Sequence, residues 1–138
     1  MGTVIRAELS QKNKYWIDRH RYYELKHFCL QYPYWNSCYS ELSFSISSPS
    51  IDATGKSCDV CDPVARYVEK RMFYRNRMDL IERLSKETDP TLWCYIFKGV
   101  TEGLSYEVLR VRMDIPCCKD VYYEAYRRFF WLLSEARQ

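Results

Sequence analysis

Glycine and histidine are both scarce in this chain of 138 residues, which contains 4 glycines and 2 histidines. A turn-rich β fold needs many glycines, so their scarcity favours helices. The sequence also lacks a glycine-rich phosphate loop, an HExxH motif and a GxSxG nucleophile elbow. Its acidic residues are spaced as on solvated helix surfaces. The sequence therefore predicts a protein that is not an enzyme and that carries no cofactor.

Long apolar runs are absent as well. No stretch of about 18 apolar residues exists, so the sequence predicts no membrane span. The first ten residues contain charges and no continuous apolar segment, which is unlike a secretory signal. We therefore expect a cytoplasmic protein.

Aromatic residues, in contrast, are abundant. Tyrosine occurs 13 times and tryptophan 4 times, and hydrophobic residues make up 47% of the chain. This is ample for a core, and the length suits one domain or a small domain with a helical arm.

The first 87 residues predict a helical arm. Apolar and aromatic residues recur at steps of three and four over 11–31, and a short helix over 34–42 follows the Tyr32-Pro33 pair. Residues 43–61 are polar and predict a long loop. Asp62-Pro63 is a favourable helix start, as a cap followed by proline, for a second long helix that reaches about residue 86. We expect the two long helices to pair as an antiparallel hairpin.

Seven cysteines are present. In a cytoplasmic protein we expect them to be reduced, as small apolar or loop residues. Cys58 and Cys61 form a lone CxxC pair, without the two further ligands that a structural zinc site needs. The sequence therefore predicts no metal site, although zinc or redox chemistry at this pair stays open.

Residues 88–138 predict a separate three-helix domain. The first helix is expected over 90–100, the second over 105–113, and the third from about Cys118 to the C-terminus. Val121 and Ala125 are expected to face inward on the third helix. A tight unit of this kind presents its last helix to a DNA major groove. The fold class is thus all-α: a long N-terminal helical hairpin followed by a C-terminal helix-turn-helix.

The run Leu104-Ser105-Tyr106-Glu107-Val108-Leu109 with Arg112-Met113-Asp114-Ile115 is similar to the helix-turn-helix domains of the sigma-factor region 4 type. The whole chain resembles the small phage and prophage regulators of the ArpU/RinA type. This resemblance implies a DNA-binding transcriptional regulator encoded by a phage or prophage. The chain departs from the pattern of these helix-turn-helix domains at Arg110, where a small residue is usual, and at Asp114, where glycine is usual. The turn must also be one residue longer, with Cys117 as the cap of the third helix.

Double-stranded DNA is the first expected partner. The predicted groove contacts are Lys119, Tyr123, Arg127 and Arg128, and the predicted phosphate contacts are Arg110 and Arg112. Positive charge gathers on the expected long helices: residues 63–86 carry seven Lys and Arg against three Asp and Glu. These charges could equally be solvated helix faces. Since one such unit rarely binds tightly alone, we expect a homodimer.

A host protein is the alternative partner. Phage proteins of this size also inhibit host factors such as RNA polymerase or a defence nuclease of the CRISPR type. The aromatic stripe that includes Tyr15, Trp16, Tyr22 and Tyr23 would then form the interface, because tyrosine and tryptophan are favoured at binding hot spots. The competing interpretation is that this stripe is core between the two long helices.

Overall fold

The computed structural model describes residues 13–47 and 63–138, and in this part of the chain all regular structure is helical. The helices are α1 (Arg19–Leu30), α2 (Tyr32–Ser47), α3 (Pro63–Thr88), α4 (Trp93–Glu102), α5 (Tyr106–Met113) and α6 (Lys119–Ala136). The prediction of an all-α fold is confirmed for these residues. None of the described helices combines the length and the apolar character that a membrane crossing requires.

The expected helix over 11–31 is shorter than predicted. Asp18 has an extended backbone and its carboxylate accepts a hydrogen bond from the backbone N–H of His20, so it caps α1 and the helix begins at Arg19. Residues 13–18 form a turn instead. The aromatic spacing alone does not reveal this start, because Tyr15 and Trp16 continue the helical period into the turn.

α2 begins one residue after the C-cap of α1, at Tyr32. Pro33 lies in its first turn, where the missing N–H has no intrahelical partner to lose. The observed helix is thus longer at both ends than the one predicted over 34–42. The predicted polar loop is wrong for 43–47, which are helical, and its remaining residues, with Cys58 and Cys61, lie outside the described residues.

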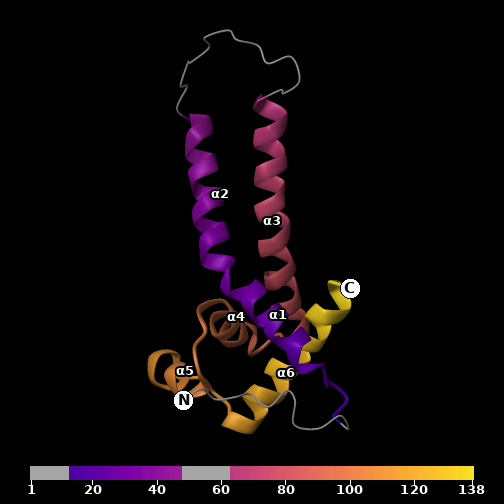
Figure 1. Cartoon of the computed structure of the whole chain (residues 1–138). Helices are drawn as coiled ribbons and strands as arrows, with labels where there is room; N and C mark the ends of the chain where they lie inside the picture. Colours follow the sequence, from indigo (N-terminus) through magenta and orange to yellow (C-terminus); the bar gives the residue numbers. More distant parts are fainter. Residues whose placement is uncertain (1–12, 48–62) are drawn as a thin grey trace.

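α2 and α3 pack along each other and project from the rest of the molecule (Figure 1). Tyr32 donates a 2.7 Å hydrogen bond to Glu82 at the base of this hairpin. Further out, Arg71 lies over the ring of Tyr39, with 4.9 Å between the guanidinium carbon and the ring centroid, and the Tyr67 hydroxyl donates to the Leu42 carbonyl. The predicted start of α3 at Pro63 is confirmed. Its partner is α2, however, and not the segment 11–31.

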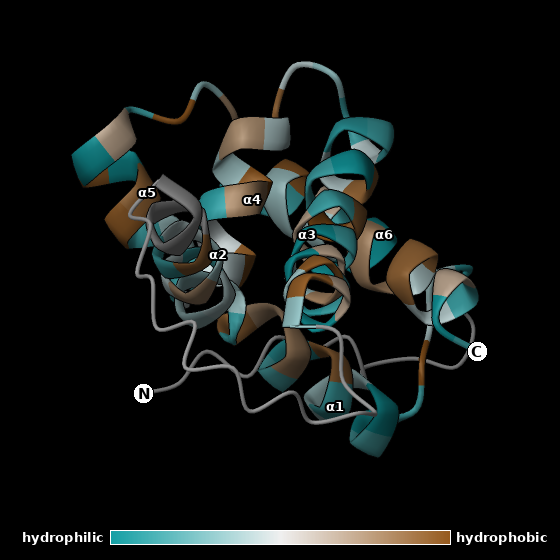
Figure 2. Cartoon of the chain, turned by 90° about the horizontal axis from the view of Figure 1, so that it is seen from above, coloured by the Kyte–Doolittle hydropathy of each residue, from teal (hydrophilic) through white to brown (hydrophobic). Residues whose placement is uncertain are grey.

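The remaining helices form a body at the base of the hairpin. α6 packs against α1, α3 and α4, while α5 lies at the outer edge beyond α4 (Figures 1 and 2). The buried residues of α6 are Tyr122, Tyr123, Ala125, Tyr126, Phe129, Phe130 and Leu133. Full burial of a phenylalanine contributes roughly 1.5–3 kcal/mol, so α6 is the main source of the core.

Rings from α1 join the core. Tyr22 contacts Phe130 edge-on at 5.2 Å between ring centroids, and its hydroxyl shares a 2.9 Å hydrogen bond with the hydroxyl of Tyr126. Burial raises the pKa of Tyr126 well above its usual range. Tyr126 therefore stays neutral at physiological pH, as an apolar core requires.

Candidate nucleic-acid interface

Two local features set the position of α5. Gly103 follows α4 and has a left-handed backbone (φ 70°), which ends the helix and turns the chain toward α5. Ser105 then caps α5, and its hydroxyl accepts a 3.3 Å hydrogen bond from the backbone N–H of Val108. The helix that the sequence predicts over 105–113 thus begins after Ser105, a residue type that is favoured as an N-cap.

The turn between α5 and α6 follows the expected plan with one correction. Asp114 has a left-handed backbone (φ 51°), and Ile115 is buried beneath the turn. The Tyr106 hydroxyl donates a 2.6 Å hydrogen bond to the Cys117 carbonyl and so ties the turn to α5. The cap of α6 is Cys118 and not Cys117, and its side chain makes no capping hydrogen bond.

The phase of α6 differs from the prediction. Tyr123 was expected in the groove, but it is only 8% exposed, and its hydroxyl accepts a hydrogen bond from the backbone N–H of Tyr106. Val121 was expected in the core, but it is 49% exposed. Tyr123 faces the start of α5 through its hydrogen bond with Tyr106, and the contacts of α6 with α1, α3 and α4 determine the rest of its buried arc.

The cations that were predicted on α6 differ in their surroundings. Lys119 is exposed and lies 3.2 Å from a carboxylate oxygen of Glu107 on α5. Arg127 is half-buried and lies 3.8 Å from Glu124. Arg128 is exposed and has no carboxylate within ion-pair distance among the described residues. Arg128 is therefore the cation of this helix that is most available to an anionic ligand.

Arg110 and Arg112 are both exposed on α5, but they occupy different sides of it. Glu107 faces the start of α6 through Lys119. At about 100° per residue, Arg110 lies roughly 60° from Glu107, whereas Arg112 lies roughly 140° away. Arg110 thus borders the surface formed by the first turns of α6, and Arg112 does not.

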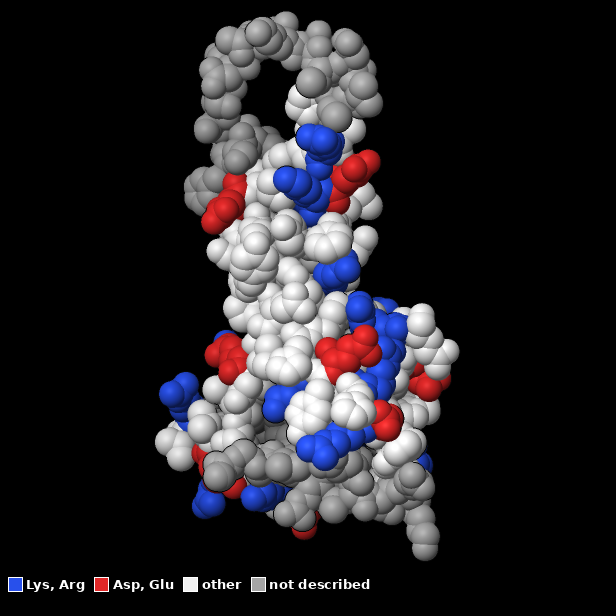
Figure 3. All heavy atoms as spheres, in the orientation of Figure 1, with Lys and Arg blue, Asp and Glu red and all other residues white. Residues whose placement is uncertain are grey.

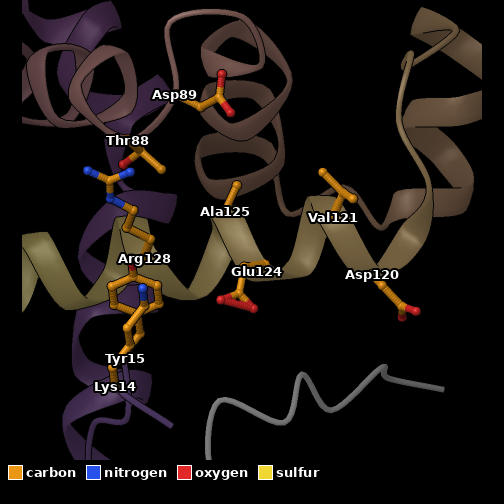
Figure 4. Close-up of a pocket in the computed structure, with 9 residues that line it drawn as sticks. All are labelled: Lys14, Tyr15, Thr88, Asp89, Asp120, Val121, Glu124, Ala125 and Arg128. Atoms are coloured by element: carbon orange, nitrogen blue, oxygen red, sulfur yellow. The ribbon is translucent and has the colours of Figure 1, made fainter.

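A hollow of about 480 Å³ lies against the outer face of α6. Its wall combines the outer residues of α6 with residues 14, 15, 88 and 89 from the two flanking segments. In Figure 4 the side chain of Arg128 extends toward Thr88 at the end of α3, while Glu124 and Asp120 project from other parts of the helix. Tyr15 also contacts Trp131, at 5.9 Å between ring centroids. This contact lies in the second half of α6, away from the first turns of the helix.

The aromatic residues that were predicted to bind a partner differ in their exposure. Tyr22 is a core residue, 5% exposed, so the proposal of a surface role for it is wrong. Tyr15, Trp16 and Tyr23 are half-buried. The large apolar residues that are exposed on the hairpin are instead Tyr34, Val68, Met72 and Phe73, together with Val64.

The sequence does not indicate a second group of cations, which consists of Arg21 on α1, Arg77 on α3 and Arg137 at the end of α6. The excess of positive charge over 63–86 was the one available signal. It could not identify the group, because the contributing residues lie on three different helices.

Comparison of the chain with protein-family models, with curated protein sequences and with solved structures finds no match.

Proposed function

We propose that the protein is a DNA-binding transcriptional regulator of the phage or prophage type, which uses α4, α5 and α6 as a helix-turn-helix. The observation that carries this proposal is the exposure of Arg110 on α5 and of Arg128 on the outer face of α6, with no carboxylate partner for either among the described residues. Two exposed cations of this kind are suited to contacts with DNA phosphates. The similarity of residues 104–115 to helix-turn-helix domains adds the expectation of sequence-specific binding.

The contact set differs from the one that the sequence predicts. Val121 takes the place of Tyr123 on the outer face of α6, where it lies one turn from Glu124. An exposed valine suits contact with a thymine methyl group, and a glutamate can accept a hydrogen bond from the cytosine amino group. Arg127 and Arg128 extend this face by one further turn. Base reading would thus combine one apolar and one acidic contact with phosphate contacts from the arginines.

The test is binding of the purified protein to a random-sequence DNA duplex at two salt concentrations, followed by selection of bound sequences. We expect Arg110→Ala with Arg128→Ala to weaken binding and to reduce the steepness of the salt dependence by about two phosphate contacts. The matched control is Arg75→Ala with Lys98→Ala, which removes the same net charge from two existing ion pairs. Equal affinity of the two double variants would remove α5 and α6 from the interface.

A protein-binding function is a second candidate, since the hairpin exposes Val68 and Met72 one turn apart on α3. Such a protein would inhibit a host factor, for instance RNA polymerase or a defence nuclease. We expect Val68→Glu with Met72→Glu to abolish co-elution with purified host RNA polymerase and to leave duplex binding unchanged. If the wild-type protein does not co-elute with the polymerase, this partner is excluded.

A further inference from the structure

Three arginines from three helices meet where the end of α6 lies beside α3. Arg21 on α1 donates hydrogen bonds to the carbonyl oxygens of Ser134 and Arg137, at 3.1 and 2.9 Å, and a third to the Ser134 hydroxyl at 3.2 Å. It also forms an ion pair with Glu24 at 2.8 Å. Arg21 thus satisfies the free carbonyls at the negative end of the α6 dipole and fixes the backbone of Arg137.

The other two arginines are held by aromatic rings. The guanidinium carbon of Arg77 lies 3.7 Å from the centroid of the Phe73 ring, and that of Arg137 lies 3.7 Å from the centroid of the Phe28 ring. A guanidinium that rests on a ring keeps its N–H groups free at the edge of the plane. The contacts also reduce the rotamer entropy that a ligand would otherwise have to remove. Both arginines are therefore prearranged as donors.

Neither Arg77 nor Arg137 has a carboxylate within ion-pair distance among the described residues. Partial burial lowers the pKa of Arg137 below its usual value, the charges of Arg77 and Arg21 lower it further, and the charge of Glu24 offsets part of this shift. The cations therefore repel one another in the folded protein. A bound anion would relieve this repulsion.

The cluster continues outward along α3. Lys70 and Arg66 precede Arg77 by 7 and 11 residues and lie within roughly 20° of it around the helix axis, because 3.6 residues complete one turn. Both are exposed, and neither has a carboxylate partner in the described part of the chain. From Arg66 to Arg77 the helix rises by about 16 Å. In Figure 3 positive side chains are visible along α3 and gather where the C-terminal end of the chain lies beside it.

We propose that Arg77 and Arg137, extended by Lys70 and Arg66, bind the sugar-phosphate backbone of a nucleic-acid duplex. A row of cations of this length exceeds what one small anion can contact, and the flat guanidinium edges match phosphate oxygens. The two rings lie beneath guanidinium groups, so no base stacks on them and the contacts are independent of sequence. The site is separate from the α5–α6 surface: Lys119 and Arg137 lie at opposite ends of α6, about 27 Å apart. It does not require that α6 enter a groove.

The test measures the affinity of the full chain for a fluorescent 24-base-pair duplex of random sequence over a range of salt concentrations. For Arg77→Gln with Arg137→Gln we expect an affinity about tenfold lower at moderate salt. We also expect a salt dependence shallower by about two phosphate contacts, at a slope of roughly 0.9 per contact. Arg77→Lys with Arg137→Lys keeps the charge but loses the planar donors, and we expect an intermediate affinity. The control Arg75→Ala with Lys98→Ala, of equal net charge to the glutamine variant, should retain more affinity than that variant.

The outcomes separate this site from the α5–α6 surface. If the glutamine variant binds as the control does while Arg110→Ala with Arg128→Ala binds less, the α3 site is wrong and the helix-turn-helix stands. If instead the glutamine variant binds less than the control while Arg110→Ala with Arg128→Ala binds as the control does, the α3 site stands and the α5–α6 surface is wrong. Absence of duplex binding by the wild-type chain overturns both. Binding of poly-L-glutamate in place of duplex would indicate an acidic protein partner and would also overturn the proposal. Circular dichroism confirms that each variant keeps its helices.

Discussion

At the scale of single residues, the Tyr122 hydroxyl is a polar group of the core that lacks a hydrogen-bond partner among the described residues. The side chain of Tyr122 is fully buried. The hydroxyl lies against Gly99 on α4, so that a Cβ atom at position 99 would collide with it. Glycine at 99 is therefore required by this one atom, since the other neighbours of that Cβ would lie at an ordinary 3.5 Å.

This arrangement predicts a strong coupling between the two positions. We expect Tyr122→Phe to leave stability unchanged or to raise it by about 1 kcal/mol, because an unsatisfied buried hydroxyl is removed. Gly99→Ala alone should destabilise the protein by about 1–3 kcal/mol through overpacking. In the Tyr122→Phe background it should instead stabilise by up to about 1 kcal/mol, since alanine favours a helix over glycine. Urea unfolding of the four proteins gives the coupling energy, and additive effects would contradict the proposed contact.

At the scale of secondary structure elements, the length and burial of α5 make its cap important. Leu109 is its one buried residue, and its 8 residues are too few for independent stability. The Ser105 hydroxyl supplies one of the few interactions that favour its first turn. The proposed interface therefore includes the shortest helix of the body, which also has the fewest buried residues.

We expect Ser105→Ala to cost about 1 kcal/mol in the local stability of α5. Because α5 lies at the edge, the loss should appear as faster amide hydrogen exchange over 106–113, with little change over the buried part of α6. Ser105→Asp is the matched control, since aspartate also caps well and should keep the slow exchange. Equal protection of α5 in the alanine variant would show that Leu109 and the Tyr106 hydrogen bond hold the helix without the cap.

The same scale shows what the sequence can predict. Pro63 and Ser105 mark helix starts through their own backbone chemistry, so both starts follow from local residues. The rotational phase of α6, in contrast, does not follow from local residues. Val121, Tyr122 and Tyr123 are all apolar enough for a core, and their sequence period is compatible with more than one buried arc. The choice depends on how α6 packs against α1, α3 and α4 and against the start of α5, where the Tyr123 hydroxyl accepts a hydrogen bond from the Tyr106 backbone N–H. The same limit applies to the Arg21, Arg77 and Arg137 group, which exists only once three helices are packed together.

At the scale of the whole molecule, the core is shared between the predicted arm, residues 1–87, and the predicted domain, residues 88–138. α1 and the base of α3 pack on α4 and α6, which places Leu25 and Ile81 in the same core as Ile96 and Phe129. The projecting part of the hairpin is the portion of the arm that needs little from the C-terminal helices. A division at residue 87 would therefore cut through the core.

This shared core predicts that a fragment of residues 1–87 does not fold alone. It would expose Leu25, Met78, Ile81 and Leu84, each at a cost of roughly 1.5–3 kcal/mol. The sum is comparable with the 5–15 kcal/mol that stabilises a typical domain. Circular dichroism of the isolated fragment should show little helix and no cooperative melting, and addition of a fragment of residues 88–138 should restore both. Cooperative melting of the 1–87 fragment by itself would establish the boundary at residue 87. The hairpin would then be an independent arm that any partner-binding function could use without the rest of the chain.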